Sequence, residues 1–104
     1  MKIKDTDLNL FIAFDVIYTE KNLTKSGQVL GITQPAVSNA LARLRDLFND
    51  ELFIRTSRGM IPTPVANQLI GDIRNALSLI QNTISVSEKF DPSTAEMTFK
   101  ISIG

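Results

Sequence analysis

The chain has 104 residues, carries eleven basic and eleven acidic side chains, and contains neither cysteine nor histidine. This length suits one small domain with an additional element. The absence of cysteine excludes disulfides and thiolate metal sites, and the absence of histidine removes the usual general base and metal ligand. We therefore expect no enzyme, no cofactor and no metal site. Because the net charge is zero, any binding of nucleic acid would depend on a few well-placed arginines and not on a broad positive field.

The chain also lacks the signals of a membrane or secreted protein. No apolar run approaches the roughly 18 residues of a membrane-spanning helix, and the opening residues lack the apolar core of a signal peptide. The expected location is the cytoplasm, with the protein at the nucleoid if it binds DNA, and no membrane partner is expected.

Apolar side chains at helical spacing predict a first helix that ends at about Glu20. Either Thr6 or Asp7 can cap this helix, because both side chains accept a hydrogen bond from the unpaired amides of a first turn. Lys21 and Asn22 would then interrupt it. The stripe that we expect to be buried consists of Leu10, Phe11, Phe14, Ile17 and Tyr18.

A short second helix is expected to begin after Thr24, which would be its N-cap, and to end near Leu30. Leu23 would be a hydrophobic lead-in, and Val29 and Leu30 would face the core. A glycine inside a helix costs about 1 kcal/mol relative to alanine. Gly27 is therefore expected to permit a close approach between helices.

The segment 31–48, GITQPAVSNALARLRDLF, predicts a turn followed by a third helix. Gly31 suits the left-handed position after the second helix, Thr33 is a good N-cap, and Pro35 fits a first turn. Asn49 and Asp50 would end the helix, since asparagine tolerates the left-handed conformation. The predicted buried face follows spacings of four, three and four, and consists of Val37, Leu41, Leu44 and Phe48.

The opposite face of this third helix carries small polar groups and almost no large apolar ones. Residues 23–48 thus predict a helix–turn–helix whose third helix is presented outward. Short donors and acceptors at a helix N-terminus suit the reading of base edges in a major groove. An ordinary amphipathic helix with a solvated polar face fits these residues equally well. The members of this face are Gln34, Pro35, Ser38, Asn39, Ala42 and Arg43.

A two-stranded wing is predicted next, with a strand over 51–55, a turn over 56–59 and a returning strand at 60–61. A two-stranded hairpin is marginal alone, so this one must pack against the helices. Arg55 and Arg58 flank its turn, and arginines there can enter a minor groove or pair with phosphates. The alternative is that both arginines are merely solvated.

Thr63 as N-cap and Pro64 at the first position predict a long helix over 65–85. Its apolar residues recur at spacings of three and four, close to the heptad seam of a coiled coil. A long helix with one narrow apolar stripe usually packs on a copy of itself, so we expect a homodimer, although packing on its own domain is the alternative. The predicted seam consists of Ala66, Leu69, Ile73, Leu77, Ile80 and Ile84, with Ile70 and Ala76 as alternative members.

The end of the chain resembles the start of another domain. Residues 87–95 are a polar connection, and the apolar residues at 99, 101 and 103 alternate with others as in one strand. A lone strand is not stable without partners. The predicted organisation is a winged helix–turn–helix domain over 1–62, with its helix–turn–helix at about 23–48 and its wing at about 51–62. A linker helix over 63–86 and a hinge with the first strand of a missing domain over 87–104 complete it.

The stretches TQPAVSNALARLRDLF and ELFIRTSRGMIPTP, at their spacing, resemble the LysR-type transcriptional regulators. The resemblance covers residue 6 to about residue 85, and the tail matches the start of the family's effector-binding domain. It implies a mainly α winged helix–turn–helix, with three helices and a two-stranded wing, followed by a long dimerising linker helix. Residues near the start and around the wing look like the branch that contains nodulation regulators, aromatic-degradation regulators and LeuO-like proteins.

The resemblance also implies roles for individual residues. It places Thr33, Gln34, Pro35, Ser38 and Asn39 at the recognition-helix positions that face DNA, and Arg55 and Arg58 at the wing arginines. The chain departs from the pattern at four places: Asn39 where many members have arginine, Ser26-Gly27 where Ala-Ala is usual, Arg45 where glutamate is frequent, and Asn49 where glycine is frequent. Asparagine suits adenine, whereas arginine suits guanine.

The leading hypothesis is therefore a sequence-specific dimeric DNA-binding domain that recognises an inverted-repeat operator. The full-length protein would be a tetramer controlled by a small-molecule effector through its missing domain. The alternatives are a helical protein-interaction module without specific DNA binding and, much less supported, an enzyme, because the acidic cluster of Asp46, Asp50 and Glu51 fits a solvated helix end. The candidate DNA-binding residues are Thr24, Thr33, Gln34, Pro35, Ala36, Ser38, Asn39, Arg43, Arg55 and Arg58.

Overall fold

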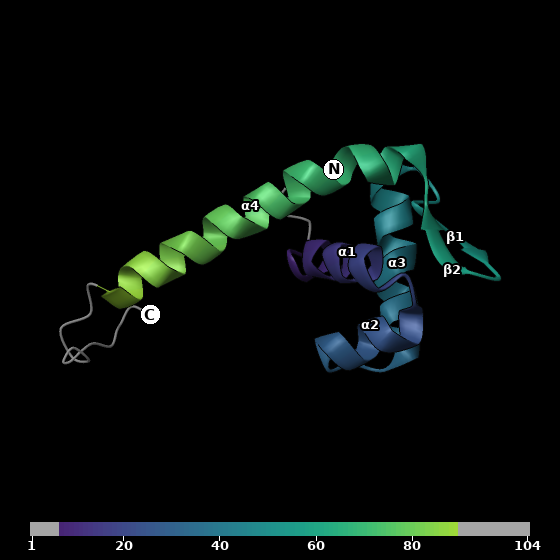
Figure 1. Ribbon diagram of the computed structural model, residues 1–104, viewed down its shortest axis with the longest axis horizontal. Helices are drawn as coiled ribbons and strands as arrows, with labels where there is room; N and C mark the ends of the chain where they lie inside the picture. The colour runs from purple at the N-terminus through teal and green to yellow at the C-terminus, as the bar shows by residue number, and fades with distance from the viewer. Residues whose placement is uncertain (1–6, 90–104) are drawn as a thin grey trace. The chain divides into compact units, whose positions relative to one another are not determined.

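The computed structural model describes residues 7–89 and contains four helices and one antiparallel hairpin in this range (Figure 1). The expected fold class, a winged helix–turn–helix followed by a long helix, is confirmed. The predicted cap at Thr6 and the predicted strand near the C-terminus lie outside the described residues. The elements are α1 (Asn9–Glu20), α2 (Leu23–Leu30), α3 (Gln34–Phe48), β1 (Phe53–Thr56), β2 (Gly59–Pro62) and α4 (Pro64–Lys89).

The core lies where α1, α2 and α3 pack on one another and the hairpin closes one side. Phe14 of α1 and Phe53 of β1 are completely buried, with ring centroids 5.3 Å apart. Phe11 meets Phe48 edge-on at 6.4 Å, which joins α1 to the end of α3. The predicted stripes are mostly confirmed: Leu10, Phe14, Ile17, Val37, Leu41 and Leu44 are buried, and Phe11, Tyr18 and Phe48 are half-buried.

The N-cap of α2 is Asn22 and not Thr24, as the sequence had suggested. The Asn22 Oδ1 atom accepts the Lys25 N–H at 2.8 Å, so the helix already begins at Leu23. Thr24 lies exposed in the first turn. Asparagine and threonine are both good N-caps, and two of them stand one residue apart here. At the start of α1, the N-cap position is Leu8, which makes no side-chain cap bond, and Asp7 Oδ1 just before it accepts the Asn9 N–H at 2.9 Å.

The buried face of α2 also differs from the prediction. Val29 is 60% exposed, whereas Ser26 and Gly27 are buried. The inward stripe passes through Leu23, Ser26, Gly27 and Leu30 at helical spacing, and Val29 falls outside it. A Cβ on Gly27 would lie 2.7 Å from the Ile32 carbonyl oxygen, so the expected close approach is confirmed, although the nearest neighbour is the backbone of the turn.

The boundaries of α3 follow the predicted chemistry. Thr33 Oγ1 accepts the Ala36 N–H at 3.3 Å, and Pro35 lies in the first turn. Gly31 before the helix has φ +73° and Asn49 after it has φ +52°, both in the left-handed region. These local signals therefore place the recognition helix within one residue of its predicted ends.

The wing is shorter and tighter than predicted. Phe53 pairs with Pro62 and Thr56 with Gly59, which leaves a two-residue turn at 57–58. The first strand begins two residues later than expected because Leu52 has φ +65°, which interrupts the extended backbone. A leucine rarely adopts this conformation, so nothing in the sequence indicates it.

Helix α4 begins at Pro64 with Thr63 as its cap, since Thr63 Oγ1 accepts the Ala66 N–H at 3.2 Å. It continues to Lys89, so residues 87–89, which were expected in the hinge, are helical. The chain divides into two units, and the first ends at Ile73 and not at residue 62. The reason is that Ala66, Ile70 and Ile73 are buried. Within the described residues no helix is both long and apolar enough to cross a membrane.

Candidate nucleic-acid interface

One face of α3 is open and polar. Gln34, Asn39 and Arg43 are exposed on it, and Ser38 is half-buried. Gln34 Nε2 lies 3.4 Å from Ser38 Oγ, one helical turn away, so the two side chains stand side by side. Because the buried residues of α3, Val37, Leu41 and Leu44, lie on the opposite side, this face offers hydrogen-bonding groups with little to obstruct them.

The wing presents its two arginines from different positions. Arg55 pairs with Met60, so both side chains project from the same side of the hairpin, and Met60 is buried against the helices. Arg58 lies in the turn. Thr56 holds that turn, because its Oγ1 accepts the Arg58 N–H at 3.1 Å and donates to the Gly59 carbonyl at 2.9 Å. Both arginines are exposed.

Three predicted residues from three different elements converge on one recess of about 90 Å³. They are Thr24 of α2, Gln34 of α3 and Arg55 of β1. Lys21 lines the same recess, although the sequence had not singled it out. A hydroxyl, an amide and an arginine around one small polar recess form an arrangement that suits an anionic group such as a backbone phosphate.

The remaining predicted residues of α3 lie on its two flanks. Ser38 lines a second recess of about 330 Å³ between α3 and β1, together with Arg55 and Arg45. On the other flank, Asn39 and Arg43 line a groove of about 440 Å³ against α1, together with Ala36. Pro35 and Thr33 are exposed at the start of the helix. Thr33 and Arg58 line none of these three recesses.

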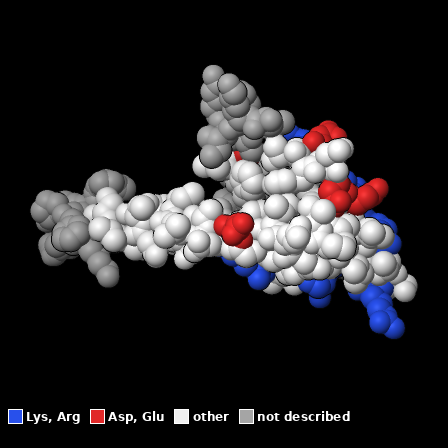
Figure 2. All heavy atoms as spheres, turned by 90° about the horizontal axis from the view of Figure 1, so that it is seen from above, with Lys and Arg blue, Asp and Glu red and all other residues white. Residues whose placement is uncertain are grey.

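The charges are not evenly mixed on the surface. Figure 2 shows Lys and Arg side chains gathered mainly along one edge of the folded unit, down to the end that carries the wing. The Asp and Glu side chains on this face lie mostly away from that edge. A chain of zero net charge can therefore still offer a locally positive edge to a polyanion.

Two lysines near the N-terminus of α2 were missed by the sequence reasoning. Lys25 is exposed in the first turn. Lys21 is half-buried, its Nζ donates to the Tyr18 carbonyl at 2.6 Å, and it lies 4.5 Å from the Tyr18 ring centroid. A signal for both was available in the sequence, because they flank Thr24, a candidate DNA-binding residue.

Helices α2 and α3 with the turn between them, followed by the hairpin, define a winged helix–turn–helix protein. Residues 8–67 match the family described as bacterial regulatory helix-turn-helix proteins, lysR family. The chain belongs to this family.

Individual relatives and solved structures support this family assignment. The HTH-type transcriptional regulator LeuO of Escherichia coli is 47% identical over 102 residues, which cover 98% of this chain and 32% of that protein. The crystal structure of a probable transcriptional regulator from Pseudomonas aeruginosa superposes with a TM-score of 0.76 at 34% identity, over 88% of this chain and 30% of that one. Vibrio fischeri DarR, whose structure was solved in complex with DNA, superposes with a TM-score of 0.70 at 26% identity, over 77% of this chain and 27% of that one. The chain thus spans about a third of the length of its curated relatives.

Proposed function

We propose that this chain is the DNA-binding part of a dimeric transcriptional regulator that binds an inverted repeat. The observation that carries the proposal is the open polar face of α3, placed beside a wing that presents two exposed arginines. A related structure, DarR, was solved in complex with DNA, which supports the same use of the fold here. The regulators LeuO and NahR extend the proposal to control of transcription.

In this proposal α3 enters the major groove with its N-terminal half. Gln34, Ser38 and Asn39 then read base edges, because each offers donors and acceptors on a short side chain. Asn39 would favour adenine, since an asparagine amide can make two hydrogen bonds to the N6 and N7 edge of that base. The small side chains at Pro35 and Ala36 leave room for the helix to approach the bases.

Contacts to phosphates would set the register of the protein on DNA. Thr24 and Arg55 line one recess and would together contact one backbone phosphate there. Arg43 would contact another at the far flank of α3, and Thr33 another at its N-terminus. Arg58, at the tip of the wing, would enter the neighbouring minor groove and respond to its width.

The proposed dimer uses the part of α4 that the first unit leaves available. Ala66 and Ile73 are buried in a single chain and offer a partner little surface, so we remove them from the expected seam. Leu77 is half-buried, and Ile80 and Ile84 are each 45% exposed. Leu69 is half-buried and stays in the seam as a peripheral member. Two such helices would place two recognition helices on two half-sites.

The function is tested by selecting DNA duplexes from a random pool with the 104-residue chain. The affinity of the most enriched duplex is then measured at several salt concentrations. An enriched inverted repeat with a steep loss of affinity at higher salt is the expected result. Weak binding without enrichment would contradict sequence-specific recognition by this chain. No binding at all would favour the alternative, a helical protein-interaction module.

The seam is tested separately by sedimentation of Ile80→Asp and Ile84→Asp. Burying a carboxylate in an apolar interface is unfavourable, so both variants should sediment as monomers. Asn82→Asp is the matched control, because it adds the same charge at an exposed position outside the seam. Dimers that persist in both isoleucine variants would refute the seam. A control that also dissociates would show that any added charge is sufficient.

We also propose that the full-length regulator assembles as a tetramer and responds to a small-molecule effector through a separate domain. This extension depends on the family resemblance and on the greater length of the relatives.

A further inference from the structure

We infer that Arg45 is a positioning residue for the wing: it anchors β1 to the C-terminal end of α3 and so sets where Arg55 lies beside the recognition face. The inference rests on the proposed function, because the position of the wing matters only if the wing arginines contact DNA. The residues that flank Arg45 fit a solvated arginine on a helix equally well.

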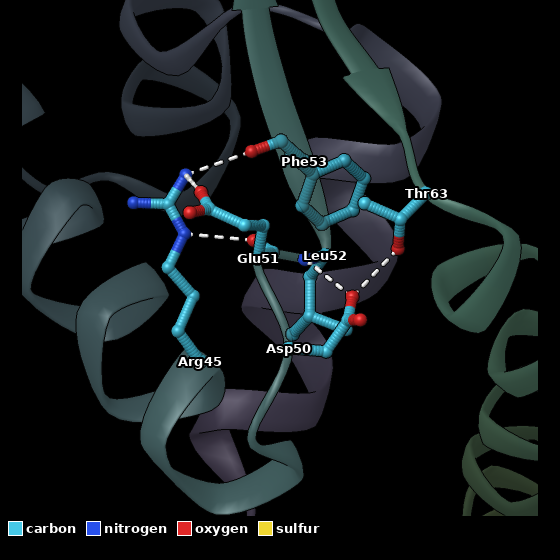
Figure 3. A network of polar contacts seen from close by, with 6 residues as sticks. All are labelled: Arg45, Asp50, Glu51, Leu52, Phe53 and Thr63. Atoms are coloured by element: carbon cyan, nitrogen blue, oxygen red, sulfur yellow. Dashed lines mark hydrogen bonds and ion pairs between the residues drawn. The ribbon is translucent and has the colours of Figure 1, made fainter.

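The anchor is a pair of hydrogen bonds from one guanidinium to two backbone carbonyls (Figure 3). Arg45 Nε donates to the Glu51 carbonyl at 2.7 Å, and Nη2 donates to the Phe53 carbonyl at 2.7 Å. The planar fork of a guanidinium can make both bonds at once, whereas a lysine has a single ammonium group.

The ion pair with Glu51 is not the main part of the anchor. Arg45 Nη2 lies 3.9 Å from the Glu51 carboxylate, and the Glu51 side chain is 73% exposed. Exposed pairs of this kind contribute little to stability. The two carbonyl bonds are much shorter, and one of them is to the first residue of β1.

The segment held by Arg45 is fixed from its other side as well. Asp50 Oδ2 accepts the Leu52 N–H at 2.9 Å and the Thr63 hydroxyl at 2.8 Å (Figure 3). The Thr63 N–H in turn donates to the Leu52 carbonyl at 2.9 Å. Leu52 is completely buried and keeps a left-handed backbone that leucine normally avoids. Arg45 and Thr63 thus hold the approach to β1 between α3 and the start of α4.

The strand β2 has an independent tie. The Met60 N–H donates to the Lys21 carbonyl at 2.9 Å, which connects the hairpin to the turn between α1 and α2. Without Arg45, the hairpin would keep this tie on β2 and the Leu52 bonds to Asp50 and Thr63, but the Glu51 and Phe53 carbonyls would lose their donor. Arg55 lies on β1, about 7 Å beyond the anchored carbonyl at 3.4 Å per residue, so a change in the tilt of β1 moves its side chain.

The anchor itself is tested without DNA, by amide hydrogen exchange in the 104-residue chain. In Arg45→Met, the amides of the hairpin should exchange about tenfold faster relative to those of α1, because β1 can detach locally while the helices remain folded. The matched control is Glu51→Gln, which removes the ion pair and keeps both carbonyl bonds. Equal acceleration in the hairpin and in α1 would overturn the inference, and so would an Arg45→Met effect that Glu51→Gln reproduces.

The consequence for DNA is tested by a double-mutant cycle on a labelled mixed-sequence duplex. Arg45→Met should lower affinity about fivefold when the wing is intact and less than twofold in the Arg55→Ala/Arg58→Ala background. Arg45→Lys should lie between Arg45→Met and the wild type. An equal loss in both backgrounds would overturn the positioning role, since Arg45 would then act without the wing arginines. If the wild-type chain does not bind the duplex, the proposed function fails, and the exchange measurement alone decides whether the anchor exists.

Discussion

Replacing Gly59 by alanine should weaken the attachment of the wing to the helices. Among the glycines outside α2, we expect this substitution to have the largest effect. Gly59 has φ +112°, a region that residues with a side chain rarely adopt. A Cβ built at this position would lie 2.5 Å from the Lys21 carbonyl oxygen. That oxygen also accepts the Met60 N–H, so the added methyl group would push apart the two segments that this bond joins.

The magnitude follows from two contributions. A residue with a side chain held in a sparsely populated backbone region costs about 1–3 kcal/mol. Loss of the Met60–Lys21 hydrogen bond costs about 0.5–1.5 kcal/mol. We therefore expect Gly59→Ala to lower the free energy of unfolding by about 1.5–4.5 kcal/mol, a large part of the about 5–15 kcal/mol of a typical domain.

The assay is equilibrium unfolding in urea, with two further glycines as graded controls. Gly31 has φ +73° but open space around it, so Gly31→Ala should cost only about 1–2 kcal/mol. Gly71 lies in α4, and a Cβ added to it would contact no other part of the protein within 4 Å. Gly71→Ala should therefore stabilise the protein by up to about 1 kcal/mol. If Gly59→Ala cost no more than Gly31→Ala, the contact with the Lys21 carbonyl would not matter and the reasoning would be refuted.

Four further substitutions separate DNA contacts from structural roles. Arg58→Ala should weaken binding across many sequences and reduce the slope of log affinity against log salt by about one, in fluorescence titrations at several salt concentrations; an unchanged slope would show that Arg58 contacts no phosphate or groove. Asn22→Ala should lower stability in urea by about 1 kcal/mol through loss of the α2 cap, whereas Thr24→Ala should stay within about 0.5 kcal/mol and instead weaken DNA binding. If Thr24→Ala lowered stability more than Asn22→Ala, Thr24 and not Asn22 would be the N-cap of α2. Asp50→Ala should lower stability by about 1–3 kcal/mol, because it leaves two donors without their acceptor, and calorimetry should show a correspondingly lower Tm.

The helical part of the fold could be predicted because its signals are local. Thr33 and Thr63 cap their helices through contacts within three residues, and Gly31 and Asn49 end helices by a backbone conformation that their residue types favour. The polar face of α3 follows in the same way from the spacing of its apolar residues. Such features depend on neighbours along the chain, which a sequence displays directly.

The missed features depend on segments that are distant in sequence. The left-handed Leu52 is stabilised by Asp50 and Thr63, and neither partner indicates that a leucine would adopt this conformation. The recess that joins Thr24, Gln34 and Arg55 forms only when three elements pack together. For α4, an apolar stripe of constant spacing cannot show that its first part, through Ile73, is buried in the core of the first unit.

Among the described residues the sheet of the wing has two strands, so both are edge strands there and could pair with another chain. The protein covers part of each edge itself. The Phe53 carbonyl is occupied by Arg45 and the Met60 amide by the Lys21 carbonyl, and both partners lie outside the hairpin. Pro62 removes one more donor from the end of β2. Ile54 and Ile61, an exposed apolar pair in register, would otherwise favour sheet extension. The contacts that orient the wing thus also protect it from aggregation, and a variant that loosens it should self-associate at concentrations where the wild type does not.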